Sequence, residues 1–114
     1  MTAGRGSATR HWRNQRLTSI ALVPLALWFV ISLLSRPRLD HATVVAWLGE
    51  PMQTLLAALF GGVMLWHSLQ GVTVVLEDYV RGQAFSASLW LARVVHVAAV
   101  AALAWALFVL ARMT

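Results

Sequence analysis

The sequence contains no cysteine and no lysine. The absence of cysteine excludes disulfides, thiolate metal sites and covalent haem attachment through a C-x-x-C-H motif. All nine basic residues are therefore arginine, and acidic residues number only four. Charged residues make up 11% of the chain, whereas ordinary globular domains have roughly 25%. So few charges cannot cover a soluble domain of this size.

Apolar residues make up 60% of the 114 residues, and the mean hydropathy is +0.72. These values predict an integral membrane protein rather than an unusually apolar soluble helical bundle. The pI near 11.7 does not indicate a nucleic-acid partner, because the arginines form no patch. They flank the apolar runs, where charges that set membrane topology belong. The expected environment is a lipid bilayer.

Three apolar runs predict three transmembrane helices in one domain that covers residues 1–114. The first run has 18 residues without a charge, which as a helix spans ~27 Å of a hydrocarbon core of ~30 Å. We expect an all-α membrane protein with a polar N-terminal tail at 1–16 and helices at about 17–34, 51–79 and 88–110.

Proline and glycine mark several predicted boundaries. Pro24 falls inside the first helix, where a kink or a freed carbonyl is expected. Pro51 suits the first turn of the second helix because its missing N–H would be unpaired there anyway. Gly82 is a plausible stop after that helix, and residues 36–50 form a short connection.

The N-terminal run has two other interpretations, a signal peptide and a transit peptide. A signal peptide has an apolar region of roughly 7–15 residues followed by a small-residue cleavage site. This run is longer and ends in an arginine-containing segment, so we expect a retained helix. The 16-residue tail is short for a transit peptide, which favours a bacterial inner membrane over a mitochondrial precursor.

Arginine counts predict the orientation of the helices in the membrane. Six arginines fall on the side of the N-terminus and of the turn after Tyr79, and three fall on the other side. Because cytoplasmic loops carry the excess of Arg and Lys, we expect a cytoplasmic N-terminus and a periplasmic C-terminus.

His67 is an ionisable residue deep inside the second predicted helix. At 100° per residue, Gly71, Val74 and Asp78 lie within about 40° of His67 around the helix and form one stripe with it. A neutral imidazole is a good iron ligand, and Gly71 removes a side chain that would crowd a flat macrocycle. Without cysteine, such a haem would be non-covalent and of b type. The alternative is a structural histidine bonded to a neighbouring helix.

Asp78 and Tyr79 lie at the predicted cytoplasmic end of the same helix. A tyrosine hydroxyl can donate to a ligand carbonyl, and a nearby carboxylate can relay protons. The alternative is an interfacial tyrosine beside a solvated acid. Two small-residue pairs on this helix, Ala57/Gly61 and Ala58/Gly62, favour close helix packing, either within this chain or with another.

Two ordered motifs then identify a family. Residues 67–80 read His-Ser-Leu-Gln-Gly, Val-Thr, then Val-Val-Leu-Glu-Asp-Tyr-Val, and residues 11–20 read His-Trp-x-x-Gln-Arg-Leu-Thr-Ser-Ile. Together with the size and the three-helix plan, they resemble the hydrophobic membrane-anchor (D-type small) subunit of succinate dehydrogenase, in its alphaproteobacterial form.

The resemblance implies a non-catalytic subunit of a respiratory complex. Such anchors pack against a second three-helix cytochrome b subunit and dock the iron–sulfur and flavoprotein subunits, so that electrons from succinate reach ubiquinone. By resemblance, His67 is one axial ligand of a haem b shared with the partner. Tyr79 hydrogen-bonds ubiquinone with Asp78 beside it, and Arg16 lies near the haem propionates and quinone pocket.

Other functions are compatible with these residues. The same scaffold serves fumarate reductase, and a haem-less structural scaffold would need none of these roles. An exporter is disfavoured because none of the four acids lies mid-span. His96 is expected to hydrogen-bond a helix neighbour rather than bind iron, and His11 and His41 to be interfacial or solvated.

Overall fold

The computed structural model describes the backbone of residues 2–113 and the side chains of residues 9, 10 and 12–113. The chain forms four helices, α1 (Thr2–Leu34), α2 (His41–Gly49), α3 (Pro51–Tyr79) and α4 (Gln83–Met113), and the described residues contain no strand. Three segments are long and apolar enough to cross a membrane: Trp12–Leu34, Pro51–Tyr79 and Gln83–Met113. The predicted all-α plan with three membrane helices is therefore confirmed.

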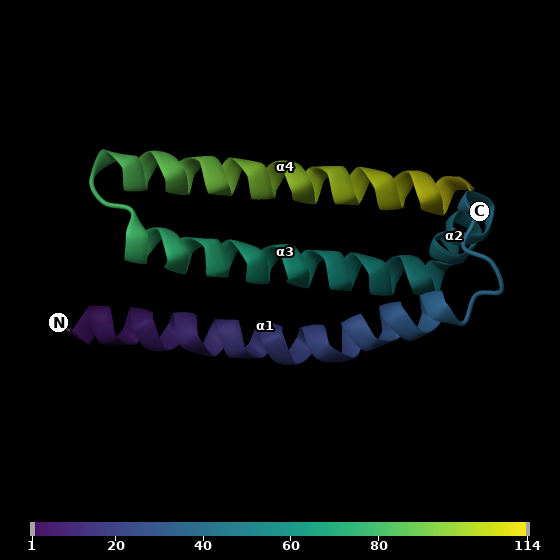
Figure 1. Ribbon diagram of the computed structural model, residues 1–114, viewed down its shortest axis with the longest axis horizontal. Helices are drawn as coiled ribbons and strands as arrows, with labels where there is room; N and C mark the ends of the chain where they lie inside the picture. The colour runs from purple at the N-terminus through teal and green to yellow at the C-terminus, as the bar shows by residue number, and fades with distance from the viewer. Residues whose placement is uncertain (1, 114) are drawn as a thin grey trace.

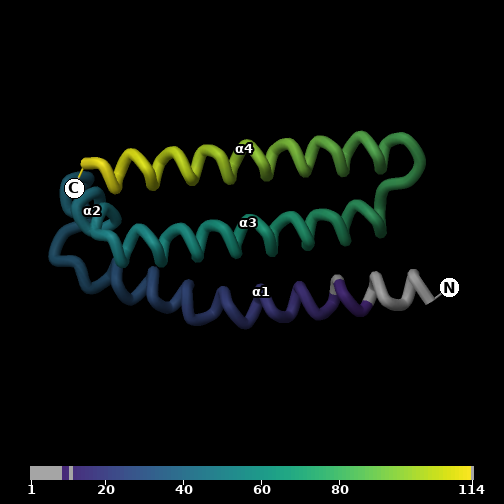
Figure 2. Tube along the Cα trace, turned by 180° about the vertical axis from the view of Figure 1, so that it is seen from behind, coloured from purple at the N-terminus to yellow at the C-terminus, as the bar shows by residue number. Residues whose placement is uncertain are grey.

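The three long helices lie side by side, with α3 between α1 and α4 (Figure 1). Helix α3 contacts both of its neighbours, α1 and α4. Seen from behind, the same order holds, and α2 sits across the end where α1 leaves and α3 begins (Figure 2). The turn between α3 and α4 lies at the opposite end, level with the N-terminal part of α1.

The helix termini differ from the predicted spans in a consistent way. Helix α1 begins at Thr2 instead of near residue 17, and α4 extends from Gln83 to Met113 rather than over 88–110. Apolar runs measure the lipid-facing length, whereas Arg, Gln and Ala next to them are good helix formers that continue the backbone pattern. Pro24 lies inside α1 without ending it.

Helix α3 begins and ends where the sequence predicts. Pro51 occupies the first turn, and the helix ends at Tyr79 because Val80 is extended. Gly82 then adopts a φ of 67°, a left-handed conformation that is nearly free of steric cost only for glycine. The backbone can therefore reverse and enter α4 within a few residues.

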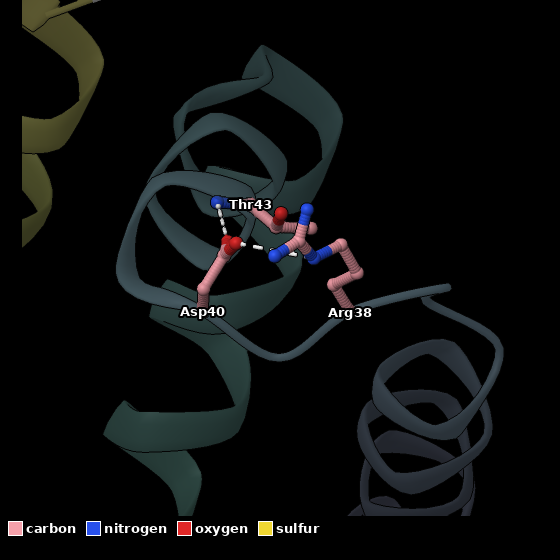
Figure 3. A network of polar contacts seen from close by, with 3 residues as sticks. All are labelled: Arg38, Asp40 and Thr43. Atoms are coloured by element: carbon pink, nitrogen blue, oxygen red, sulfur yellow. Dashed lines mark hydrogen bonds and ion pairs between the residues drawn. The ribbon is translucent and has the colours of Figure 1, made fainter.

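The connection between α1 and α3 contains a helix that the sequence analysis did not identify. Asp40 caps α2, because its carboxylate accepts a hydrogen bond from the backbone N–H of Thr43 at 2.9 Å (Figure 3). Arg38 approaches the same carboxylate at 3.6 Å, but both side chains are exposed, and exposed ion pairs contribute little. The cap therefore depends on the bond to Thr43.

Helix α2 holds the most buried side chain of the described residues. Trp47 is 2% exposed, with its ring centroid 6.0 Å from those of Trp28 and Phe29 in α1. Phe29 also lies 5.4 Å from Phe60 of α3. Trp28 donates a hydrogen bond to Gln53 Oε1 at 3.1 Å. This aromatic cluster joins α1, α2 and α3 at one end of the molecule.

Helices α3 and α4 approach closely at Gly61. A Cβ placed on Gly61 would come within 2.5 Å of Leu103 Cδ2, whereas a Cβ on Gly62 would meet nothing within 4 Å. The predicted close packing through small residues is therefore found at Gly61, which packs against α4 of this chain. The Gly62 side faces away from the described residues of the chain.

Outside the aromatic cluster, most apolar side chains are not covered by the chain itself. Trp47 is the only buried hydrophobic side chain among the described residues, and large apolar residues are exposed along all three spans. In water such a surface would be untenable. The single chain therefore needs lipid, a partner protein or both to cover its helices.

We expect Gly61→Val to lower the free energy of unfolding by about 1–3 kcal/mol through overpacking against Leu103. Gly62→Val carries the same cost in helix propensity, but a Cβ at Gly62 meets no atom of the described residues within 4 Å, so it is the matched control. Detergent-induced unfolding of the purified chain, followed by circular dichroism, measures the difference. Equal losses from both variants would contradict the close α3–α4 contact.

We expect α2 to lose protection on acidification. Hydrogen bonds from the Thr43 hydroxyl and then its backbone N–H lower the pKa of Asp40. A lowered pKa stabilises the folded state above the ordinary carboxyl pKa, and this stabilisation is lost as pH falls through the folded value. Amide hydrogen exchange of residues 41–44 should accelerate in acid beyond its intrinsic pH dependence. Asp40→Asn caps without titrating, and an identical response in this variant would refute the role of Asp40.

Candidate functional site

His67 faces helix α1 from the middle of α3. Its Nδ1 lies 2.8 Å from Thr18 Oγ1, a contact between residues 49 positions apart. Both side chains are half-buried. Because α1 and α3 run side by side in opposite directions (Figure 1), the early part of α1 lies level with the second half of α3. The structure thus gives His67 a protein partner inside the membrane span.

Thr18 stands at the centre of a group of polar contacts. Its Oγ1 lies 3.0 Å from the backbone oxygen of Asn14 and 3.0 Å from that of Gln15. Gln70 Oε1 on α3 lies 3.5 Å from the same atom. A threonine in a helix commonly donates to the carbonyl one turn earlier. We call these four residues, together with His67, the Thr18 cluster.

Gln15 occupies the space beside Gly71. A Cβ on Gly71 would lie 4.0 Å from Gln15 Nε2, which is ordinary van der Waals distance. Gln15 Oε1 itself is buried and has no hydrogen-bond partner among the described residues. The space that the sequence analysis assigned to a flat macrocycle beside Gly71 is therefore partly bordered by the Gln15 amide.

Sequence reasoning did not identify Thr18 or Gln70 as members of this site. The signal was present: Asn14, Gln15 and Thr18 are polar residues at helical spacing where α1 enters its apolar run, and Gln70 follows His67 by three positions. Such residues fall on one helix face. Only the pairing of α1 with α3 shows that the two polar faces meet.

Asp78 and Tyr79 are exposed at the end of α3. The Tyr79 side chain is 82% exposed, and neither residue makes a side-chain hydrogen bond or ion pair with the described part of the chain. Because α3 stays helical to Tyr79, Asp78 lies ~16 Å along the axis from His67. The structure keeps both on one helix but does not bring them together.

Arg16 lies away from the other predicted site residues. Its guanidinium sits 5.2 Å from the ring centroid of Trp12 on the same helix, and its side chain is exposed. Two helical positions turn it about 200° from Thr18, which faces α3. The structure does not bring Arg16 to His67, Asp78 or Tyr79, so any role there requires another subunit.

His96 forms the expected hydrogen bond to a neighbouring helix. Its Nδ1 lies 2.7 Å from Ala92 O, and its Nε2 lies 3.1 Å from Ser68 Oγ of α3. Since a carbonyl only accepts, Nδ1 carries the proton and Nε2 accepts from the serine hydroxyl. His41 is exposed, as expected, and the His11 side chain lies outside the described residues.

A hollow beside the Thr18 cluster has a volume of about 410 Å³ and is lined by Asn14, Gln70 and Arg93 among others. His67 does not line it. Within the described residues, no three His, Asp, Glu or Cys side chains lie close enough to hold a metal ion. A metal centre with three or more such ligands would therefore need ligands from outside the described residues.

Comparison with known proteins gives the family. Residues 2–111 match the family described as succinate dehydrogenase/fumarate reductase transmembrane subunit. The chain is 30% identical over 113 residues to the succinate dehydrogenase hydrophobic membrane anchor subunit of Paracoccus denitrificans, covering 96% of this chain and 85% of that protein.

Two Rickettsia proteins of the same name match a shorter stretch. The R. felis protein is 29% identical over 76 residues and the R. bellii protein 30% identical over 79 residues, covering 67% and 69% of this chain. The chain spans about 63% of the length of each. No solved structure matches. The match over nearly the whole chain, on a three-helix membrane fold, places this protein in the family of succinate dehydrogenase and fumarate reductase transmembrane subunits.

Proposed function

We propose that this chain is the membrane-anchor subunit of a succinate:ubiquinone oxidoreductase. In this proposal it ligates one side of a haem b, forms part of the ubiquinone site and anchors the iron–sulfur and flavoprotein subunits together with a cytochrome b subunit. The observation that carries the proposal is the state of His67 inside the span. Its Nδ1 is held by α1, while its Nε2 has no hydrogen bond with any described residue.

The chemistry of the His67 imidazole suits a haem iron. An axial histidine coordinates through one nitrogen and typically donates a hydrogen bond through the other. His67 is half-buried rather than buried, so part of its side chain is accessible at the surface of the chain. A haem held between two proteins would take one ligand from each, and His67 is the residue of this chain that would supply it. When bound, a haem b supplies a one-electron redox centre.

The buried Gln15 amide gives a second observation that suits a polar group from outside the chain. Its Oε1 is buried without a partner, and an unsatisfied amide in hydrocarbon is costly. The oxygen and nitrogen of a glutamine amide are interchangeable by a flip. Gln15 could therefore accept from a partner donor or donate to a carboxylate such as a haem propionate.

The proposed quinone site lies at the end of α3. Tyr79 can donate its hydroxyl hydrogen to a quinone carbonyl, and Asp78 beside it can exchange protons with water. Both residues are exposed in this chain, so the remaining walls would come from the cytochrome b and iron–sulfur subunits. In this arrangement Tyr79 orients the quinone and Asp78 supplies protons to the same end.

The proposed location is the bacterial inner membrane with the N-terminus in the cytoplasm. The N-terminal part of α1 and the α3–α4 turn lie at one end of the molecule (Figure 1), and this end holds the larger share of the arginines. Soluble partners that deliver electrons to a quinone bound at Tyr79 would dock there. The uncovered apolar faces of the spans would meet lipid and the cytochrome b subunit.

Fumarate reductase is the second candidate, because the description of the matched family names both succinate dehydrogenase and fumarate reductase. The named relatives above are succinate dehydrogenase anchors, which favours succinate oxidation. The direction of the reaction depends on the redox potentials of the quinone and of the other subunits, not on His67 or Tyr79.

We expect His67→Ala to abolish or strongly alter the b-type optical spectrum of the purified complex, because an axial ligand is removed. His96→Gln is the matched control, since both nitrogens of His96 are already hydrogen-bonded within this chain. The control should retain the spectrum. An unchanged spectrum in His67→Ala would refute the ligand assignment and favour the haem-less scaffold.

We expect Tyr79→Phe to slow ubiquinone reduction roughly tenfold. Loss of one hydrogen bond worth about 1.4 kcal/mol changes a rate by this factor. Succinate oxidation with a soluble artificial acceptor should be unaffected, because the flavoprotein does not depend on Tyr79. Trp90→Phe, at another exposed aromatic residue, is the control. Parallel loss of both activities would indicate failed assembly rather than a quinone contact.

A further inference from the structure

We propose that Thr18 is a positioning residue for His67: its hydroxyl oxygen accepts the Nδ1 proton of the imidazole and thereby presents Nε2, with its lone pair, to the iron. This inference rests on the proposed function of His67 and adds a residue on a different helix. The Thr18 hydroxyl would fix both the tautomer and the ring orientation of the ligand.

The direction of the Thr18–His67 hydrogen bond follows from counting hydrogens. The Thr18 hydroxyl has one hydrogen, and its oxygen lies 3.0 Å from each of two backbone carbonyls. Carbonyls only accept, so the hydrogen of Thr18 is directed to them. The arrangement that satisfies all of these contacts has His67 Nδ1 supplying the hydrogen for its 2.8 Å contact with Thr18 Oγ1. A neutral imidazole protonated at Nδ1 carries its lone pair on Nε2.

The position of Thr18 suits this role because helix α1 holds it. Its hydroxyl is bonded to the backbone one turn earlier, so the acceptor oxygen moves only with the helix. Both side chains are half-buried within the spans, where water does not compete well for the imidazole N–H. A hydrogen bond at the remote nitrogen raises the basicity of a ligating histidine, which stabilises the more oxidised iron.

The test uses the assembled four-subunit complex and three substitutions at Thr18. Thr18→Val keeps the branched shape but removes the acceptor, Thr18→Ser restores it, and Thr18→Cys replaces it with a weaker acceptor. Ser19→Ala is the matched control, because Ser19 donates to Gln15 O at 2.8 Å but is exposed and makes no bond to α3. The readouts are haem retention against apomyoglobin and the haem midpoint potential by redox titration.

We expect Thr18→Val to speed haem loss about 10- to 100-fold, the usual effect of removing such a partner, and to raise the midpoint potential. Thr18→Ser and Ser19→Ala should match the unaltered complex, and Thr18→Cys should fall between. A purely structural role would not shift the potential. If the valine complex does not assemble, an unshifted potential in Thr18→Cys overturns the proposal.

The outcomes separate this inference from the proposed function. If His67→Ala alters the haem spectrum but Thr18→Val leaves retention and potential unchanged, the positioning role is overturned and the ligand assignment stands. If His67→Ala leaves the spectrum unchanged, His67 is not a ligand and Thr18 has no haem role. A shift in Thr18→Val that Thr18→Ser does not reverse would also overturn the role of the hydroxyl.

Discussion

The structure depends on one constraint: a polar group inside the hydrocarbon core needs a partner from the protein, because lipid offers none. His67 meets this constraint through Thr18 across the α1–α3 contact, and His96 meets it through Ser68 across the α3–α4 contact. Each histidine thus fixes α3 against a different neighbour. These two polar links add to the packing that holds α3 between α1 and α4.

His67 and His96 satisfy this requirement for a polar partner in different ways, and the difference bears on function. Both nitrogens of His96 are used within the chain, by Ala92 and Ser68. His67 uses one nitrogen and keeps the other free of hydrogen bonds to the described residues. Residue type alone does not separate the two histidines, whereas their hydrogen-bond partners differ.

The chain leaves most of the faces of its membrane helices uncovered. Trp47 is the only buried hydrophobic side chain of the described residues, and it ties together the end of the molecule opposite Tyr79. Elsewhere the three long helices form one layer (Figure 2), and large apolar side chains are exposed along all three of them. A layer of this kind is incomplete as a core but suits an anchor, because its faces are available to a second membrane subunit and to lipid.

The sequence by itself determined the membrane setting, the three spans and the ends of α3, because these depend on hydropathy and on Pro51 and Gly82. It also drew attention to His67, since an imidazole deep in an apolar run is unusual whatever surrounds it. It did not predict α2 or the full length of α1 and α4, because capping and helix propensity act outside the apolar runs. The pairing of Thr18 with His67 and of Gly61 with Leu103 was decided only by tertiary structure. Contacts between residues so far apart depend on how the helices align, which periodicity within one helix does not specify.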